Sequence, residues 1–202
     1  GGEGHNGPGM SLLRVLRDWF YGTEFIAEDL GILTHDVDQL LEDSGFPGMN
    51  ILEFAFTKNA DSKYLPHRCK ANSIVYTGTH DNETITGWFD SISKEEQQAA
   101  RDYLCDQRQP KKYLHQSFIA LVMRSCAKYC IIPMQDYLGR DNSCRMNMPG
   151  TVDANWSWRL LPGQVTDELA EEVLIITKRF GRANWDAIKN LETARKLAEK
   201  AQ

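Results

Sequence analysis

The sequence lacks the features of a membrane or nucleic-acid-binding protein. Its longest apolar runs, such as residues 130–134, fall far short of the roughly 20 residues that a transmembrane helix needs. The glycine-rich start has no apolar core of the kind found in signal peptides. The net charge is −5, and no long basic run could neutralise a phosphate backbone. We therefore expect a soluble cytoplasmic protein that binds neither membranes nor nucleic acid.

The cysteines form no Cys-x-x-Cys pair, and their odd number argues against both a disulfide framework and a zinc knuckle. Cys126 and Cys130 are four residues apart and could share one face of a helix. Small apolar packing residues are nevertheless favoured over metal ligands here. We expect reduced thiols and no metal site at the five positions: Cys69, Cys105, Cys126, Cys130 and Cys144.

Four short apolar segments and several amphipathic segments predict alternating strands and helices. The 202 residues, 42% of them hydrophobic, suffice for a sizeable core. The predicted strands are residues 25–27, 49–56, 73–79 and 130–134. The predicted helices are residues 11–20 with a Ser11 cap, a helix after a Thr34 cap, and residues 93–106, 116–129, 166–180 and 185–201.

This order predicts an α/β fold with a parallel sheet, either doubly wound or part of a barrel. No strand is followed by Gly-x-Gly-x-x-Gly or a Walker lysine, so a nucleotide-binding sheet has little support. Polar residues follow the strands, as in (β/α)8 active sites, but such a barrel needs roughly eight strands. The chain is therefore expected to be half a barrel, or a different fold.

Polar side chains cluster where the predicted strands end. Glu28 follows a short apolar strand and could act as a general acid, although it or Asp29 could equally cap a turn. Residues 79–84 (THDNET) follow a β-branched strand and concentrate polar groups that are costly to bury unless used. The alternative is a turn in which Asp81 caps the segment through Trp88. The pair Gln135-Asp136 and residues 145–150 could supply amide and guanidinium hydrogen bonds to a polyhydroxyl ligand.

Several aromatic side chains could stack on sugar rings, although each one by itself is more typical of a core residue. They are Phe54, Phe56, Trp88, Trp156 and Trp158.

A series of motifs in one order resembles the 4-α-glucanotransferases of glycoside hydrolase family 77. The matching segments run from residues 7–9 to residues 155–159, over nearly the whole chain. They are residues 26–31 (IAEDLG), 46–49 (FPGM), 52–56 (LEFAF), 76–82 (YTGTHDN), 87–88 (GW), 135–136 (QD), 145–147 (RMN), 149–151 (PGT) and 155–159 (NWSWR).

The resemblance implies a fold and a set of site residues. It implies that residues 1–202 are the C-terminal part of a single (β/α)8 barrel domain, its strands five to eight with helical insertions, after a flexible glycine-rich start at residues 1–10. It implies that Glu28 is the acid/base and Asp81 the transition-state stabiliser. The substrate-binding residues it implies are His80, Asn82, Phe54, Gln135 and Asn147.

The resemblance also implies retaining transfer of α-1,4-glucan segments between maltodextrins, without a metal or organic cofactor. The family's nucleophile lies in an Arg-x-Asp-His motif, which this sequence does not contain. Activity is therefore expected to need the N-terminal half of the barrel. Glu53 stands where many relatives have glutamine, and Glu83 where many have aspartate. The alternatives are an α-amylase-like hydrolase, or a fragment that only binds carbohydrate or completes a partner.

Overall fold

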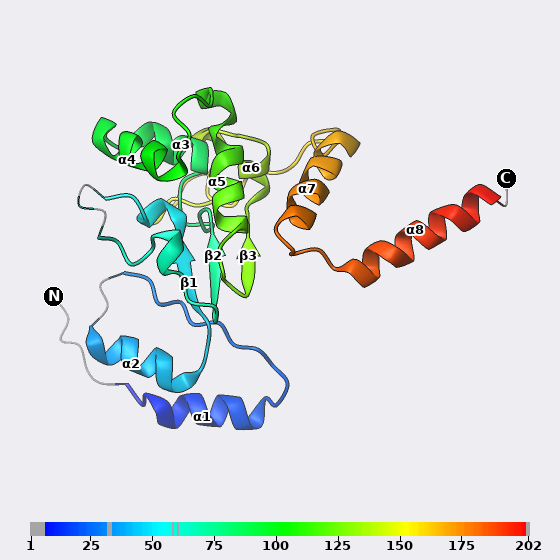
Figure 1. Cartoon of the computed structure of the whole chain (residues 1–202). Coiled ribbons are helices and arrows are strands. Elements are labelled where there is room, and N and C mark those ends of the chain that lie inside the picture. The colour runs from blue at the N-terminus through cyan, green and yellow to red at the C-terminus, as the bar shows by residue number, and fades with distance from the viewer. Residues whose placement is uncertain (1–6, 32–33, 58, 60, 201–202) are drawn as a thin grey trace. The chain divides into compact units, whose positions relative to one another are not determined.

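A computed structural model describes residues 7–31, 34–57, 59 and 61–200. The chain divides into two compact units, Gly1–Trp156 and Ser157–Gln202. The first unit contains a parallel sheet with the strand order β1 (Gly48–Ile51), β2 (Ser73–Tyr76) and β3 (Tyr129–Ile131) (Figure 1). Gly48 pairs with Ser73, and Tyr76 pairs with Ile131. The predicted α/β class and the parallel, sequential order of these three strands are confirmed.

The predicted strand at residues 25–27 is wrong, because the described residues 23–30 adopt neither helix nor strand. The Ala27 N–H donates to the Pro47 carbonyl oxygen at 3.0 Å. Two residues later, however, the Asp29 carboxylate accepts from the Met49 N–H at 2.6 Å, in the place of a backbone carbonyl. The ladder stops there, since a strand continues only through backbone pairs.

The second predicted strand ends sooner than expected, at Ile51. The chain turns there into the short 3-10 helix η1 (Leu52–Phe54), and the Ala55 N–H donates to the Leu52 carbonyl oxygen at 2.9 Å. A continuous apolar run fits a buried turn as well as a strand, so its pattern could not locate this boundary.

Helices α3 (Ile85–Ser91), α4 (Lys94–Leu104) and α5 (Leu114–Met123) pack on one another and on the sheet to form the core (Figure 1). The rings of Phe56, Trp88 and Phe118 meet there, with Trp88 and Phe118 centroids 5.6 Å apart. Trp88 and Phe56 are therefore core residues, not sugar platforms. The predicted Ser93 cap is confirmed, since Ser93 and Glu96 form a reciprocal capping box.

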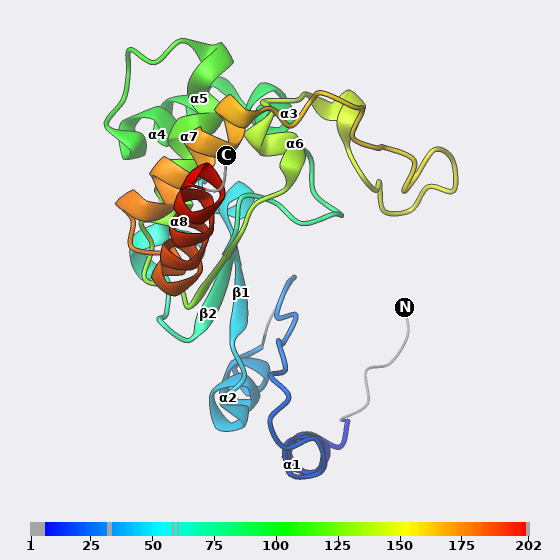
Figure 2. The ribbon, with the colours of Figure 1, turned by 90° about the vertical axis from the view of Figure 1, so that its right-hand side faces the viewer.

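Helices α1 (Met10–Trp19) and α2 (His35–Ser44) lie beside each other (Figure 2). The predicted Ser11 cap is wrong: Gly9 is the N-cap of α1, and Ser11 Oγ donates to the Pro8 carbonyl oxygen at 2.6 Å. Thr34 occupies the N-cap position of α2, but its side chain makes no capping hydrogen bond. Of the predicted flexible start, residues 1–6 lie outside the described residues.

Short elements complete the first unit, and two helices form the second. The second unit contains α7 (Asp167–Arg179), capped by Thr166, and α8 (Trp185–Lys200), in agreement with the predicted helices. Within the described part of the chain, no helix is long and apolar enough to cross a membrane. The short elements of the first unit are η2 (Pro66–Arg68), η3 (Lys111–Tyr113), α6 (Met134–Tyr137) and η4 (Asn142–Cys144).

Candidate active site

A cavity of about 630 Å³ lies at the carboxyl ends of the three strands. Its wall includes Tyr76 at the end of β2, Ile131 at the end of β3 and Phe54 shortly after β1. Glu28 and Asp81 line the same cavity, although they are 53 positions apart in the sequence. The size is typical of small-ligand sites, and both predicted catalytic carboxylates open into it.

Glu28 is positioned by the irregular segment that replaces the predicted strand. The residues on either side of Glu28 are attached to the start of β1. The Ala27 N–H donates to the Pro47 carbonyl oxygen, and the Asp29 carboxylate accepts from the Met49 N–H. The Glu28 side chain is exposed. Burial and the nearby Glu28 charge raise the pKa of the Tyr76 phenol. Tyr76 is therefore a cavity residue beside Glu28 that the sequence analysis did not single out.

Asp81 lies in a turn that its neighbours hold in place. The Asn147 amide donates to Asp81 Oδ1 at 2.6 Å, and the Arg145 guanidinium donates to the Asp81 carbonyl oxygen, also at 2.6 Å. His80 Nε2 lies 3.3 Å from Asp81 Oδ1, and the His80 ring packs on Trp156 with centroids 4.9 Å apart. The side chain of Asp81 is thus oriented by Asn147 and His80, and its backbone is held by Arg145.

Asp81 does not cap the segment through Trp88, which was the alternative to a functional role for this residue. Thr84 caps that helix by accepting from the Gly87 N–H at 3.1 Å. Asn82 forms the turn instead: its Oδ1 accepts from the Thr79 N–H at 2.9 Å and from Thr79 Oγ1 at 2.7 Å. The Asp81 carboxylate therefore does not cap α3; it faces the cavity and accepts the hydrogen bond from Asn147.

The predicted substrate-binding residues take different positions. His80, Asn82 and Phe54 line the cavity, and Phe54 is 41% exposed. Asn147 and Gln135 are not among the described residues of its wall. Asn147 holds Asp81, while Gln135 is buried and its amide donates to the Cys144 carbonyl oxygen at 3.2 Å. Contact of these five residues with a sugar stays a prediction.

A family model described as 4-alpha-glucanotransferase, of glycoside hydrolase family 77, matches residues 2–165. The chain belongs to this family. The 4-alpha-glucanotransferase of Synechocystis sp. is 39% identical over 186 residues, which cover 90% of this chain and 36% of the relative. The chloroplastic/amyloplastic 4-alpha-glucanotransferase of Arabidopsis thaliana is 43% identical, covering 82% of this chain and 28% of the relative.

The amylomaltase of Streptococcus agalactiae, solved in complex with acarbose, has a similar structure. Its TM-score is 0.83 at 33% identity, and the match covers 89% of this chain and 36% of that one. The family member described here thus spans about a third of the length of the curated relatives that it matches. Its α/β fold, with a three-stranded parallel sheet, corresponds to part of an amylomaltase.

Two carboxyl groups, those of Asp136 and Glu53, are buried beside residues 77 and 78, which follow β2. Asp136 is fully buried, where its carboxylate accepts from Thr77 Oγ1 and, at 2.8 Å, from the Ile85 N–H. Burial raises the pKa of Asp136 to about 6, although these two hydrogen bonds lower it. The expectation that Asp136 would hydrogen-bond a ligand is not supported, because its acceptors are taken up inside the protein.

Glu53 is also buried, and its Oε1 has no hydrogen-bond partner among the residues that the structure describes. Burial first, then the charges of Asp136 and Glu83, raise the pKa of Glu53 to about 9, while a backbone bond from Glu83 and the Arg145 charge lower it. Asp136 loses its proton first, so its charge acts on Glu53. Glu53 is therefore a neutral acid near pH 7.

Glu53 lies against the strand-end loop that carries Asp81. Its backbone N–H donates to the Thr77 carbonyl oxygen at 3.3 Å. A Cβ at Gly78 would lie 2.5 Å from Glu53 Oε1, so only glycine permits this approach. In the sequence, the only sign that Glu53 is unusual was its departure from the family pattern. Nothing in the sequence indicated that its carboxyl group is buried.

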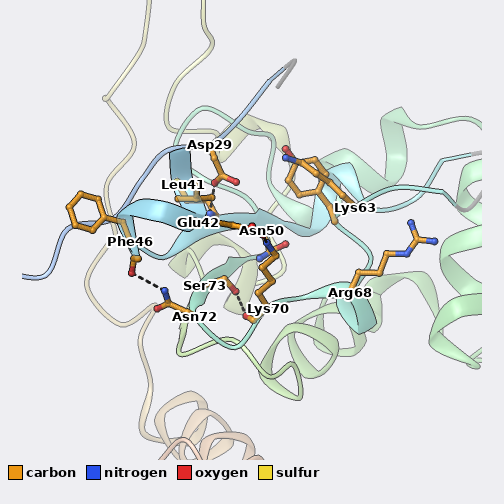
Figure 3. A pocket seen from close by; sticks show the side chains of 14 residues that line it. Asp29, Leu41, Glu42, Phe46, Asn50, Lys63, Arg68, Lys70, Asn72 and Ser73 are labelled. Atoms are coloured by element: carbon orange, nitrogen blue, oxygen red, sulfur yellow. Dashed lines mark hydrogen bonds and ion pairs between the residues drawn. The ribbon is translucent and has the colours of Figure 1, made fainter. Parts of the chain in front are cut away.

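A second cavity, of about 550 Å³, lies at the other end of the strands, beside Gly48 and Ser73 (Figure 3). Several of its charged side chains are already engaged. Lys70 Nζ pairs with Glu42 at 2.7 Å, and Arg68 donates to the Asp61 carbonyl oxygen, also at 2.7 Å. Among the residues that the structure describes, no group of three or more His, Cys, Asp or Glu could hold a metal ion. The cavity of Glu28 and Asp81 remains the candidate active site.

Proposed function

We propose that this chain is the acid/base-bearing part of a longer 4-alpha-glucanotransferase that transfers α-1,4-glucan segments between maltodextrins. The observation that carries the proposal is that Glu28 and Asp81 line one cavity at the carboxyl ends of parallel strands. In the longer protein, β1, β2 and β3 would be consecutive strands of the (β/α)8 barrel. The acarbose complex of the related amylomaltase supports a maltodextrin-like substrate.

In this mechanism an aspartate from the rest of the longer protein attacks the anomeric carbon. Glu28 protonates the departing glycosidic oxygen, which leaves a covalent glucosyl-enzyme. The Glu28 carboxylate then takes the proton from the 4-hydroxyl of a second glucan, whose oxygen displaces the enzyme aspartate. The anomeric configuration is retained because it is inverted twice.

Asp81 would stabilise the positive charge that develops on the sugar ring in the transition state. Two hydrogen bonds support this role: the one from Asn147 orients the Asp81 carboxylate, and the one from Arg145 to the Asp81 carbonyl oxygen holds the backbone beneath it before substrate arrives. His80 and the Phe54 ring would bind the sugar from the same wall. Such preorganised contacts act mainly on the transition state and therefore on kcat.

The test uses the longer protein that contains these residues. Glu28→Gln is expected to remove most transfer from maltotriose while leaving glucan affinity largely intact. The matched control is Glu42→Gln, which makes the same change beside the second cavity and should keep near-normal transfer. Near-normal transfer by Glu28→Gln would refute the acid/base role.

The products distinguish transfer from hydrolysis. A transferase redistributes maltotriose into shorter and longer chains, whereas an α-amylase-like hydrolase releases short products without lengthening. The 202 residues by themselves should show no transfer, because the sequence contains no Arg-x-Asp-His motif to supply the nucleophile. Transfer by the isolated chain would overturn this assignment, and restored transfer on adding the N-terminal half would support it.

A further inference from the structure

Two cysteines that are 57 positions apart lie against each other. Cys69 follows η2, and Cys126 lies between α5 and β3. The Cys126 thiol donates to the Cys69 carbonyl oxygen at 2.9 Å, so its sulfur lies against the residue that carries the second thiol. Nearby, the Lys128 N–H donates to the Ala71 carbonyl oxygen at 2.9 Å, which holds the two segments side by side.

The two thiols differ in their access to solvent. Cys126 is exposed, whereas Cys69 is buried and its sulfur lies 3.2 Å from Ser73 Oγ. Burial, more than the neighbouring Cys126, raises the pKa of the Cys69 thiol. A soluble oxidant therefore meets Cys126 first, with a second thiol already beside it, which is the usual arrangement of an oxidisable and a resolving cysteine.

We propose that Cys69 and Cys126 form a reversible disulfide bond when a peroxide oxidises Cys126. In the first step the Cys126 sulfur attacks a peroxide oxygen, the O–O bond breaks, and Cys126 sulfenic acid and water are formed. In the second step the Cys69 sulfur attacks the Cys126 sulfur, and the hydroxyl group leaves as water with the Cys69 proton. The two thiols lose two electrons, which reduce one hydrogen peroxide to two water molecules.

The disulfide would join the chain just before β2 to the chain just before β3. These are the amino ends of the two strands, away from the cavity of Glu28 and Asp81. A cross-link between distant positions lowers the entropy of the unfolded chain. The oxidised protein should thus have a higher Tm, and this inference does not depend on the proposed transfer reaction.

The test is to treat the folded chain with hydrogen peroxide, block free thiols with N-ethylmaleimide, and map chymotryptic peptides by mass spectrometry without reductant. The expected product is a peptide pair joined through Cys69 and Cys126, lighter by two hydrogen atoms and separated by dithiothreitol. Its formation should require the folded state and disappear when peroxide is added in guanidinium chloride.

Cys126→Ser should lose this product completely, whereas the control Cys105→Ser, which removes another exposed thiol, should form it as fully as the original chain. Circular dichroism checks that both variants fold. If Cys126→Ser does not fold, the peptide map of the original chain still decides. Oxidation of Cys126 to sulfinic acid without the Cys69 pair, or its pairing with a different cysteine, would overturn the proposal.

Discussion

Replacing Glu53 by glutamine tests whether this buried acid is neutral in the folded protein. Glutamine has nearly the same shape and cannot ionise. Glu53 is only 8% exposed and lies close to Asp136, so its ionised form is strongly disfavoured in the folded state. We expect Glu53→Gln to make the chain more stable at neutral and alkaline pH.

The sign follows from the pKa values of the two states. The Glu53 pKa is about 9 in the folded protein against an ordinary 4.5, so the folded state holds the proton more tightly. This contribution to stability is fully present below pH 4.5 and is lost as the pH rises towards 9. At about 1.4 kcal/mol per pKa unit, the loss is about 3 kcal/mol at pH 7 and at most about 6 kcal/mol at pH 9.

Urea unfolding of both proteins at pH 5, 7 and 9 measures this difference. The advantage of Glu53→Gln in the free energy of unfolding should be small at pH 5 and grow at each step. Glu95→Gln on the exposed surface of α4 controls for the exchange of a carboxylate for an amide. An advantage that does not change between pH 5 and pH 9 would refute the assignment of a buried neutral acid.

Three further predictions concern stability and are checked by thermal or urea unfolding. Gly78→Ala should cost about 1–3 kcal/mol, because its Cβ would lie 2.5 Å from Glu53 Oε1; unchanged stability would contradict the close approach. Ser93→Ala should cost about 1 kcal/mol through loss of the capping box, and a neutral result would mean that the box is dispensable. Asp136→Asn should cost about 1–3 kcal/mol, because the amide oxygen can still accept one of the bonds from Thr77 and Ile85 but the amide nitrogen cannot accept the other; equal Tm values would disprove it.

Local signals in the sequence predicted helices α1, α2, α4, α5, α7 and α8 and the order of three strands, but not helices α3 and α6. Ser93 followed by Glu96 marks a capping box, and β-branched Ile74 and Val75 mark β2. Polar residues directly after a strand predicted where Asp81 would lie. These features could be predicted because each depends on neighbours within a few residues, whose spacing is printed in the sequence.

The motifs of the sequence also placed the chain in its family, because their identity and order are independent of the coordinates. They did not predict that residues 25–27 would lack a strand. That outcome depends on Asp29, whose carboxylate takes the hydrogen bond of Met49, a residue 20 positions away. Side-chain competition for a backbone donor at such a separation leaves no periodic signal.

The tertiary structure alone decided which polar residues face the cavity and which are buried. Asp81 and Asp136 both follow strands, yet Asp81 lines the cavity while Asp136 is enclosed and bonded to Thr77. The neutral acid Glu53 likewise results from packing against Gly78, a residue on the next strand's loop. Burial and electrostatic surroundings are set by contacts between distant segments. The sequence by itself therefore determined which chemical groups the chain carries. The fold determined which of these groups reach the cavity and which are buried.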